Sequence, residues 1–379
     1  MPFDSHAPVV YQLGMKLLHE TLRALPVSVS RVFVEGLELG VPSGWVRRTS
    51  VVRLVGPAGV EGHGEDVTYA GPDHDDLQAG RVDLDFLVGT FTLGELCGVI
   101  ASRDLFCEPP AEEKARRYRQ WALESAALDL ALRQAGTTLG EVAGRVPEPV
   151  RFAVSLSLDG IDFERIEQLL QRDSRLCLKL DWSTGWDAAT LDKLQALGGS
   201  RLVQVVDFKG HYHGDFQGSP PDAGAYRAVA DALPETWLED PWLGQVQADG
   251  KSWDGATWQM LRGSAERITW DAPFGGAAFL ESLPQLPRAV NIKPSRFGSI
   301  AELFAVLDLC TQRDIQMYAG GQFELGPGRR AIQALASLFY PSAANDCAPA
   351  AFNAAELAAK LPSSPLPVGS FRGPGSFGS

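Results

Sequence analysis

The sequence predicts an α/β protein in which a barrel of alternating strands and helices follows a smaller α+β domain. Strand-like and helix-like runs alternate from Val150 to about Ala351, and repeated alternation over this many units favours a closed parallel barrel. Four successive units, spaced by roughly 20–30 residues as one β/α unit requires, each end in a charged side chain. These side chains are Asp207, Glu239, Asp271 and Lys293. Because the C-terminal ends of barrel strands carry the chemistry in such folds, the four positions predict a functional site.

Composition limits the classes of protein to consider. The chain has 379 residues, 45% of them hydrophobic and 21% charged, which is typical of a globular protein of two domains. The net charge of −13 argues against nucleic acid or an anionic membrane surface as a partner. The five cysteines are dispersed without CxxC spacing, which is typical of reduced thiols. With no membrane-spanning run and no export signal in the sequence, the expected location is cytoplasmic.

Residues 1–140 are predicted to form the α+β domain. Residues 11–25 and 111–135 have apolar side chains at helical spacing. Between them, residues 31–39, residues 48–54 and a run within 57–69 alternate in the manner of strands, so three antiparallel strands joined by turns are expected. The Pro-, Gly- and Ser-rich tail is expected either to fold back, so that residues 352–379 complete this domain, or to be partly disordered.

Residues 141–351 are predicted to form the barrel. Its expected strands are RFAVSLSL, RLCLKLDW, VQVVDFKG, TWLEDPW, RITWDAPF, AVNIKPSRFG, IQMYAGG and SAANDCAP. The expected helices between them include FERIEQLLQ, AATLDKLQAL, SIAELFAVLDLC and RRAIQALASLF.

Three carboxylates at neighbouring strand ends predict a metal site. Side chains of like charge that converge on one point raise each other's pKa values and destabilise the fold unless a cation is bound. A hard divalent cation such as Mg²⁺ or Mn²⁺ suits the oxygen ligands of Asp207, Glu239 and Asp271. Such a cation can bind a substrate carboxylate and stabilise an enediolate, with a lysine across the substrate as the base. The alternative is that the four charged residues are unrelated strand ends.

At this point the chain resembles a known family, the enolase superfamily, and in particular its muconate-lactonizing, o-succinylbenzoate synthase-like branch. The resemblance covers nearly the whole chain. VVRLVGPAGVEGHGE looks like the hairpin of the family's capping domain, and ALESAALDLALRQAGTTLGEVAG looks like the helix that leads into its barrel. NIKPSRFGS closely resembles the strand-six motif of o-succinylbenzoate synthase. The resemblance implies a modified (β/α) TIM-type barrel preceded by an α+β capping domain.

The resemblance also implies an activity. It is divalent-metal-dependent abstraction of a proton alpha to a carboxylate through an enediolate, followed by elimination or isomerisation, which is lyase or isomerase chemistry. Asp207, Glu239 and Asp271 would then bind Mg²⁺ or Mn²⁺, and Lys293 would be the main base. Two alternatives stay open. One is a non-catalytic barrel that keeps only a metal or ligand site, and the other is a Schiff-base lyase in which Lys293 or Lys179 is the nucleophile.

The second strand departs from the family pattern. The branch usually carries Lys-x-Lys there, whereas this chain has Lys179 and Asp181. Residues two apart on a strand share one face, so both side chains are expected to point into the barrel. Because the lysine normally opposite Lys293 is replaced, two-base epimerisation is not expected, and Asp181 is expected to pair with Lys179 or Lys209.

The third strand and two loops supply the remaining candidates. Lys209 shares the inward face with Asp207, where the family commonly has Asp-x-Asn, and would either offset charge or act as a base or carboxylate anchor. His211 and His213 follow it on a loop and are candidates of lower rank. The candidate substrate-binding residues are Trp45, Tyr69, Gly321 and Glu324. Glu324 would either ligate substrate or cap the next helix. The expected partner is a small-molecule carboxylate, with no nucleic acid and no membrane, and with room for a homo-oligomer.

Overall fold

The computed structural model describes residues 7–40, 44–157, 163–212, 218–248, 250–354 and 356–378. Within these residues, none of the helices combines the length and the apolar character that a membrane crossing requires.

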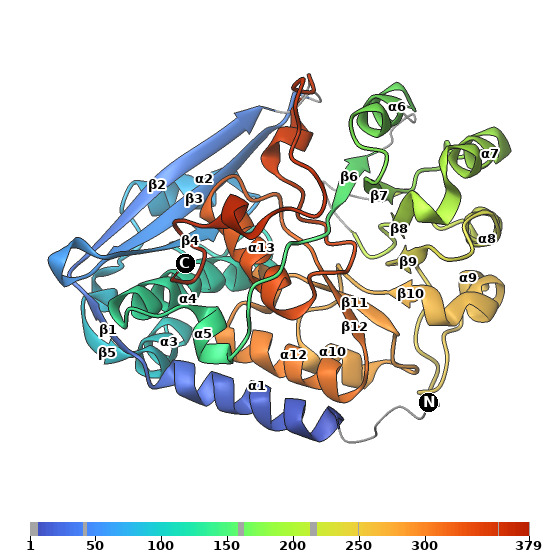
Figure 1. Cartoon of the computed structure of the whole chain (residues 1–379). Helices are drawn as coiled ribbons and strands as arrows, with labels where there is room; N and C mark the ends of the chain where they lie inside the picture. The colour runs from blue at the N-terminus through green and yellow to red at the C-terminus, as the bar shows by residue number, and fades with distance from the viewer. Residues whose placement is uncertain are drawn as a thin grey trace.

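The N-terminal part contains the predicted three-stranded antiparallel sheet (Figure 1). Its strands are β2 (Arg31–Gly40), β3 (Val46–Val55) and β4 (Glu61–Asp66), with β3 in the middle. The predicted long helix is α4 (Lys114–Gln134), and it packs against β4. Gly62 and Gly64 permit this close contact, because a Cβ atom on either would overlap the backbone of α4.

Several further elements complete the N-terminal part. The predicted first helix is present as α1 (Ala7–Arg23), and it packs against α12 of the barrel. A short antiparallel pair of β1 (Pro26–Val29) and β5 (Gly89–Thr92), which was not predicted from the sequence, is also present. The remaining helices of this part are α2 (Gly71–Gln78), α3 (Leu93–Ala101) and α5 (Leu139–Ala143).

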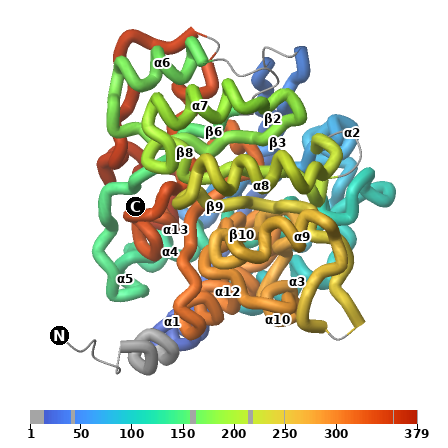
Figure 2. Tube along the Cα trace, turned by 90° about the vertical axis from the view of Figure 1, so that its right-hand side faces the viewer, coloured from blue at the N-terminus to red at the C-terminus, as the bar shows by residue number. Residues whose placement is uncertain are grey.

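The second part is the predicted parallel β/α barrel. In the described residues a five-stranded parallel sheet has the order β10-β9-β8-β7-β6, and a second sheet pairs β11 with β12. The strands are β6 (Ala153–Ser157), β7 (Cys177–Asp181), β8 (Val203–Asp207), β9 (Trp237–Glu239), β10 (Ile268–Thr269), β11 (Ala289–Ile292) and β12 (Gln316–Ala319). Figure 2 shows α6 to α9 along the outer side of the first sheet. The helices are α6 (Phe163–Arg172), α7 (Ala188–Leu197), α8 (Ala223–Ala232), α9 (Ala256–Leu261), α10 (Ala277–Ser282), α11 (Pro294–Phe297), α12 (Ile300–Gln312) and α13 (Pro327–Phe339).

The prediction of an eighth strand at residues 342–349 is wrong, because this segment closes the barrel through one residue. The backbone of Asn345 forms a single parallel bridge with Phe152, and its side chain accepts a hydrogen bond of 2.7 Å from the backbone N–H of Ala319. The Asn345 amide nitrogen donates to the carbonyls of Arg151, Tyr340 and Ala343. An asparagine side chain that bonds to nearby backbone in this way competes with a regular strand ladder.

The C-terminal tail lies against α4. Asp129 of this helix accepts hydrogen bonds from the backbone N–H groups of Gly375 (3.0 Å) and Gly378 (3.1 Å), and Arg133 donates to the carbonyl of Gly373 (2.7 Å). These contacts place the end of the chain on the N-terminal part, although the boundaries at residues 140 and 351 stay a prediction.

Candidate active site at the strand ends

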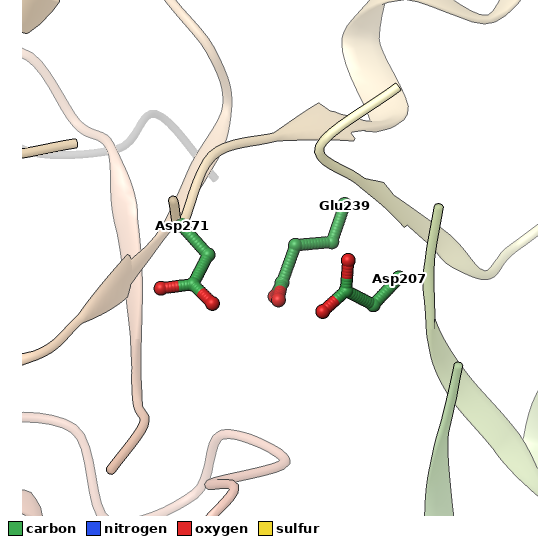
Figure 3. A group of neighbouring side chains, drawn as sticks. All are labelled: Asp207, Glu239 and Asp271. Carbon is green, nitrogen blue, oxygen red and sulfur yellow. The ribbon is translucent and has the colours of Figure 1, made fainter. Parts of the chain in front are cut away.

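Three buried carboxylates meet at the ends of β8, β9 and β10. One oxygen atom from each of Asp207, Glu239 and Asp271 lies within 4.8 Å of the corresponding oxygens of the other two. Figure 3 shows the three side chains pointing toward one another from neighbouring strands. Their positions follow from the parallel register, which pairs Asp207 of β8 with Glu239 of β9 and Glu239 with Thr269 of β10, two residues before Asp271. The convergence expected from the sequence is therefore present.

The backbone at these strand ends is unusual. Lys209 and Asp240, which follow β8 and β9, have φ angles of 54° and 49°, in the left-handed region that non-glycine residues rarely occupy. Each such residue costs on the order of 1–3 kcal/mol, and strain of this kind gathers at functional sites. Asp240 also accepts hydrogen bonds from the backbone N–H groups of Asp271 (2.8 Å) and Ala272 (2.6 Å), so it fixes the chain at Asp271.

Lys179 on β7 lies among carboxylates. Its ammonium group forms a short ion pair with Glu239 and lies 3.7 Å from Asp207 and 3.5 Å from Asp346. Burial lowers the pKa of Lys179, but the three carboxylates raise it by more than burial lowers it. The pKa of Lys179 therefore lies well above its usual value. Lys179 is therefore a fixed positive charge.

Asp181 and Lys209 form an ion pair, as the sequence analysis predicted. The Lys209 ammonium group lies 3.1 Å from Asp181 and 3.1 Å from Asp207. Although burial opposes the charge, the two carboxylates hold the pKa of Lys209 well above its usual range. Burial raises the pKa of Asp181, and Lys209 partly offsets that effect. The contacts agree with the interpretation that Lys209 offsets charge.

Asp271 has a different set of neighbours. Its Oδ2 atom accepts hydrogen bonds from Lys293 (2.7 Å) and from the Tyr212 hydroxyl (3.0 Å). Its Oδ1 atom is buried and has no hydrogen-bond donor among the residues described, and the nearest cation is Arg296, at 3.4 Å. Burial opposes ionisation of Asp271, but Arg296 and Lys293 outweigh it and hold its pKa far below its usual range. Asp271 is therefore ionised, and one of its oxygens accepts no hydrogen bond from the described residues.

Glu239 lies at the centre of the group. Tyr318 of β12 donates a short hydrogen bond to its Oε2 atom, which also accepts one from Asn291 of β11 at 3.3 Å. Burial raises the pKa of Glu239 to about 7, against the opposing effect of Lys179. Removal from water is thus the dominant influence on this carboxyl group.

The residues fit a divalent cation. Around the site, in the described residues, six carboxyl groups face four cationic side chains, and burial together with the neighbouring carboxylates raises the pKa of Asp240 well above its usual value. Oδ1 of Asp271 accepts no hydrogen bond from the described residues and lies 3.4 Å from Arg296, and an all-carboxylate set of ligands suits Mg²⁺ or a similar hard cation. The carboxyl groups are Asp181, Asp207, Glu239, Asp240, Asp271 and Asp346, and the cations are Lys179, Lys209, Lys293 and Arg296.

The candidate substrate residues Trp45 and Tyr69 lie together between the N-terminal sheet and the loop after β12. Their rings stack with centroids 6.2 Å apart, and Trp45 also lies 6.4 Å from the ring of Phe323. The guanidinium of Arg47 lies 4.4 Å from the ring centre of Tyr69 and donates to the carbonyls of Gln322 and Phe323. These aromatic rings therefore belong to a fixed contact between the two parts of the molecule.

The other two candidate substrate residues point elsewhere. Glu324 is buried, and its carboxylate accepts a hydrogen bond of 2.8 Å from the backbone of Gln322 in its own loop. The interpretation of Glu324 as a helix cap is wrong, because Glu65 of β4 accepts the hydrogen bonds of Gly326 and Gly328 at the start of α13. Position 321 has a glycine because a Cβ atom on Gly321 would overlap the Glu324 carboxylate.

Sequence reasoning missed several residues of the site. His211 packs between the rings of Trp242 and Trp270 instead of joining the carboxylates, and His213 lies outside the described residues. The residues that the structure adds are Tyr212, Asp240, Asn291, Arg296, Tyr318 and Gln322. All of them lie in segments that the sequence predicted to be barrel strands or the loops that follow them, and this was the one signal that could have found them. The order of residues in these segments did not indicate which side chains would face the carboxylates.

Comparisons with known proteins agree with this geometry. Residues 20–142 match the N-terminal domain, and residues 146–354 the C-terminal domain, of a family described as Domain of unknown function (DUF8230). The N-succinylamino acid racemase of an Amycolatopsis species is 30% identical over 306 residues, which are 77% of this chain and 76% of that protein. The o-succinylbenzoate synthase of Bacillus subtilis (strain 168) is 23% identical over 297 residues, 77% of this chain and 75% of that protein.

Solved structures share the fold. The dipeptide epimerase from Methylococcus capsulatus, crystallised with a Mg ion, superposes with a TM-score of 0.63 at 19% identity, over 83% of this chain and 88% of the other. Muconate lactonizing enzyme from Pseudomonas putida gives 0.61 at 17% identity, over 82% and 85%. The predicted fold and resemblance are thereby confirmed. The chain belongs to the family described as DUF8230 and to the enolase superfamily, in its muconate-lactonizing, o-succinylbenzoate synthase-like branch.

Proposed function

We propose that this protein is a Mg²⁺-dependent lyase or isomerase that removes a proton alpha to the carboxylate of a small-molecule substrate. The observation that carries the proposal is the buried group of Asp207, Glu239 and Asp271, with the Lys293 amine 2.7 Å from Asp271. When bound by these carboxylates, the cation would supply positive charge for the substrate carboxylate and for the enediolate. The Mg ion of the epimerase from Methylococcus capsulatus supports the choice of metal.

Lys293 is the base in this proposal. In its neutral form the amine takes the α-proton, the C–H bond breaks, and its electron pair stays on the substrate as the enediolate. The enediolate then either expels a leaving group from the β-carbon, which is elimination, or takes a proton at another position, which is isomerisation. Lys293 is buried at the end of β11, where bulk water does not compete for the proton.

The other lysines do not suit the role of base or of Schiff-base nucleophile. In the metal-free protein the carboxylates around Lys179 and Lys209 hold the pKa of each well above its usual value, despite burial, which favours the protonated form of both amines. A protonated amine can neither accept a proton nor attack a carbonyl carbon. We infer that these two lysines set the charge of the site and that a Schiff base on either of them is disfavoured.

The site also favours one-sided proton exchange. Asp181 is the last residue of β7, and it is paired with Lys209 at 3.1 Å. A carboxylate is intrinsically a weaker base than an amine, and proton transfer from a weakly acidic carbon follows basicity. Lys293 should therefore exchange the α-proton of one enantiomer much faster than Asp181 exchanges that of the other.

Calorimetry with Mg²⁺ tests the metal site. The wild-type protein should bind one Mg²⁺ ion per chain, and Glu239→Gln should remove most of the binding because it replaces the central carboxylate. Binding that is unchanged in Glu239→Gln would contradict the assignment.

Exchange of substrate protons with D₂O tests the reaction. A library of carboxylates with Mg²⁺ present should contain compounds whose α-position gains deuterium, as followed by NMR. Metal binding without deuterium uptake across the library would favour the non-catalytic alternative, in which the barrel keeps only a ligand site.

A further inference from the structure

Gln322 connects the N-terminal part of the chain to the candidate metal site. It follows β12 and is 5% exposed. Its side-chain oxygen accepts hydrogen bonds from Nη2 (2.6 Å) and Nε (3.2 Å) of Arg296, and its side-chain nitrogen donates to the Tyr69 hydroxyl at 3.1 Å. This orientation of the amide is assigned from its neighbours, because the reverse would direct its NH₂ group at the guanidinium, with donor against donor.

The hydrogen bonds of Arg296 point away from Asp271. Besides the two bonds to Gln322, Nη1 donates to the carbonyl of Ala272 at 2.6 Å. The guanidinium is nevertheless close to the carboxylate, with Nη2 3.4 Å from Asp271 Oδ1, an oxygen that has no donor among the described residues. Arg296 therefore attracts Asp271 electrostatically, while its N–H groups donate hydrogen bonds to neutral oxygens.

This arrangement matters because an arginine and a metal ion compete for the same carboxylate. A guanidinium fork matches a carboxylate in geometry and forms strong charge-assisted hydrogen bonds with it. A small movement of Arg296 would bring Nη2 into hydrogen-bond range of Asp271 Oδ1. That bond would occupy one of the lone pairs with which Asp271 can bind a cation.

We propose that Gln322 is a positioning residue that holds the Arg296 guanidinium away from Asp271 Oδ1 and so keeps this oxygen available to the metal ion. The inference rests on the proposed metal site and adds a residue that acts on it through Arg296. Tyr69 fixes the far end of the Gln322 amide, so the N-terminal part of the chain contributes to metal binding without contacting the metal ligands.

The backbone of Gln322 is held as firmly as its side chain. Its carbonyl accepts a hydrogen bond of 2.9 Å from Arg47, and its N–H donates to Glu324 at 2.8 Å. The next residue, Phe323, has a φ angle of 59°, a strained conformation that persists only where the surroundings impose it. Gln322 is therefore in a rigid position, as a residue that orients a metal ligand requires.

Calorimetric titration of the metal-free protein with Mg²⁺ tests the proposal. Gln322→Leu removes the acceptor of Arg296 and should weaken Mg²⁺ binding about ten-fold, the lower end of the effects seen for residues that orient ligands. Gln322→Glu keeps an acceptor for the guanidinium and should stay within about three-fold of the wild type. Gln333→Leu is the matched control, because Gln333 is a buried glutamine that donates to the carbonyl of Cys347 instead of facing the carboxylates, and its Mg²⁺ affinity should not change.

A second substitution separates this role from simple damage to the fold. If Arg296 competes with the metal once Gln322 is lost, the double variant Gln322→Leu, Arg296→Met should regain at least the wild-type affinity. An affinity as low as that of Gln322→Leu alone would overturn the proposal, and so would an unchanged affinity in Gln322→Leu. Absence of Mg²⁺ binding in the wild type would overturn the metal site itself. Wild-type binding that is lost in Glu239→Gln but kept in Gln322→Leu would overturn the role of Gln322 alone.

Discussion

The two sides of the carboxylate group differ in how their charges are paired. On the side of Asp207, Lys179 and Lys209 each lie within ion-pair distance of two or more carboxylates. On the side of Asp271, the described residues show one carboxylate within that distance of Lys293, and one oxygen of Asp271 has no donor.

The difference separates two tasks. An amine surrounded by carboxylates is stabilised as a cation and cannot take a proton, so the Asp207 side provides fixed charge. An amine with one partner, beside a carboxylate with an open oxygen, can change its partner when a metal and substrate arrive. The Asp271 side is therefore where we expect proton transfer, and four predictions test this contrast, beginning with the largest expected effect.

Replacement of Lys293 should have the largest effect. Lys293→Ala should lower the rate of α-proton exchange by about 10³-fold, within the range measured for loss of a general base, because no other described amine on the Asp271 side can take over. Asp181→Ala should keep most of the exchange. The measurement follows each enantiomer of a turned-over substrate in D₂O by NMR.

Equal exchange of both enantiomers in the wild type, lost in Asp181→Ala, would contradict this contrast. It would show that the Asp207 side supplies a second base.

Removal of Lys179 should have the next largest effect, on stability. Lys179→Met leaves Glu239 and Asp207 buried without their shared cation, and the loss of one partner from a buried ion group costs about 3 kcal/mol in the free energy of unfolding. Urea denaturation of the metal-free protein measures it. Saturating Mg²⁺ should restore part of the loss, because a cation that binds the folded state stabilises it. A variant as stable as the wild type would show that Lys179 is not needed to balance the charge.

The pH dependence of stability should report on Glu124, which joins α4 to the start of α12. This α4 residue is buried, and its carboxylate accepts a hydrogen bond from the backbone N–H of Ile300 at the start of α12. Burial raises the pKa of Glu124 to about 7, above its value in the unfolded chain. The folded state therefore holds a proton that the unfolded state releases, and its stabilising effect is lost as pH rises through about 7.

Glu124→Gln removes that titration but keeps an acceptor for Ile300. Relative to the wild type, the variant should gain about 2 kcal/mol of unfolding free energy between pH 5 and pH 8, measured by urea denaturation across this range. Glu113→Gln, at an exposed glutamate directly before the first residue of α4, is the control and should show no such change. A Glu124→Gln curve parallel to that of the wild type would contradict the prediction.

The smallest effect is expected for the pair of Lys209 and Asp181. Their side chains are 27% and 22% exposed, so water screens the attraction between them. A double-mutant cycle with Lys209→Met and Asp181→Asn should give a coupling energy of about 1 kcal/mol in urea denaturation. A coupling energy larger than the loss of unfolding free energy in Lys179→Met would reverse the order that burial predicts.

The sequence alone determined the fold class and the four charged strand ends. Each of Asp207, Glu239, Asp271 and Lys293 follows an apolar run, and a parallel barrel brings the C-terminal ends of its strands to one face. The pairing of Asp181 with a lysine also followed from the sequence, because side chains two residues apart on a strand share one face. These inferences required only that side chains alternate along a strand with a period of two and that the strands of the barrel run parallel.

Only the tertiary structure decided which partners these side chains have. Tyr318 reaches Glu239 from 79 residues away, and Tyr69 reaches Gln322 across 253 residues, so neither contact has a local pattern in the chain. The last barrel segment was predicted to be a strand because its neighbours alternate, but the side chain of Asn345 bonds to the backbone around it and replaces a ladder with one bridge. Periodicity gives the face of a strand on which a residue lies, whereas the direction of a side chain depends on the hydrogen bonds and charges that surround it in the folded molecule.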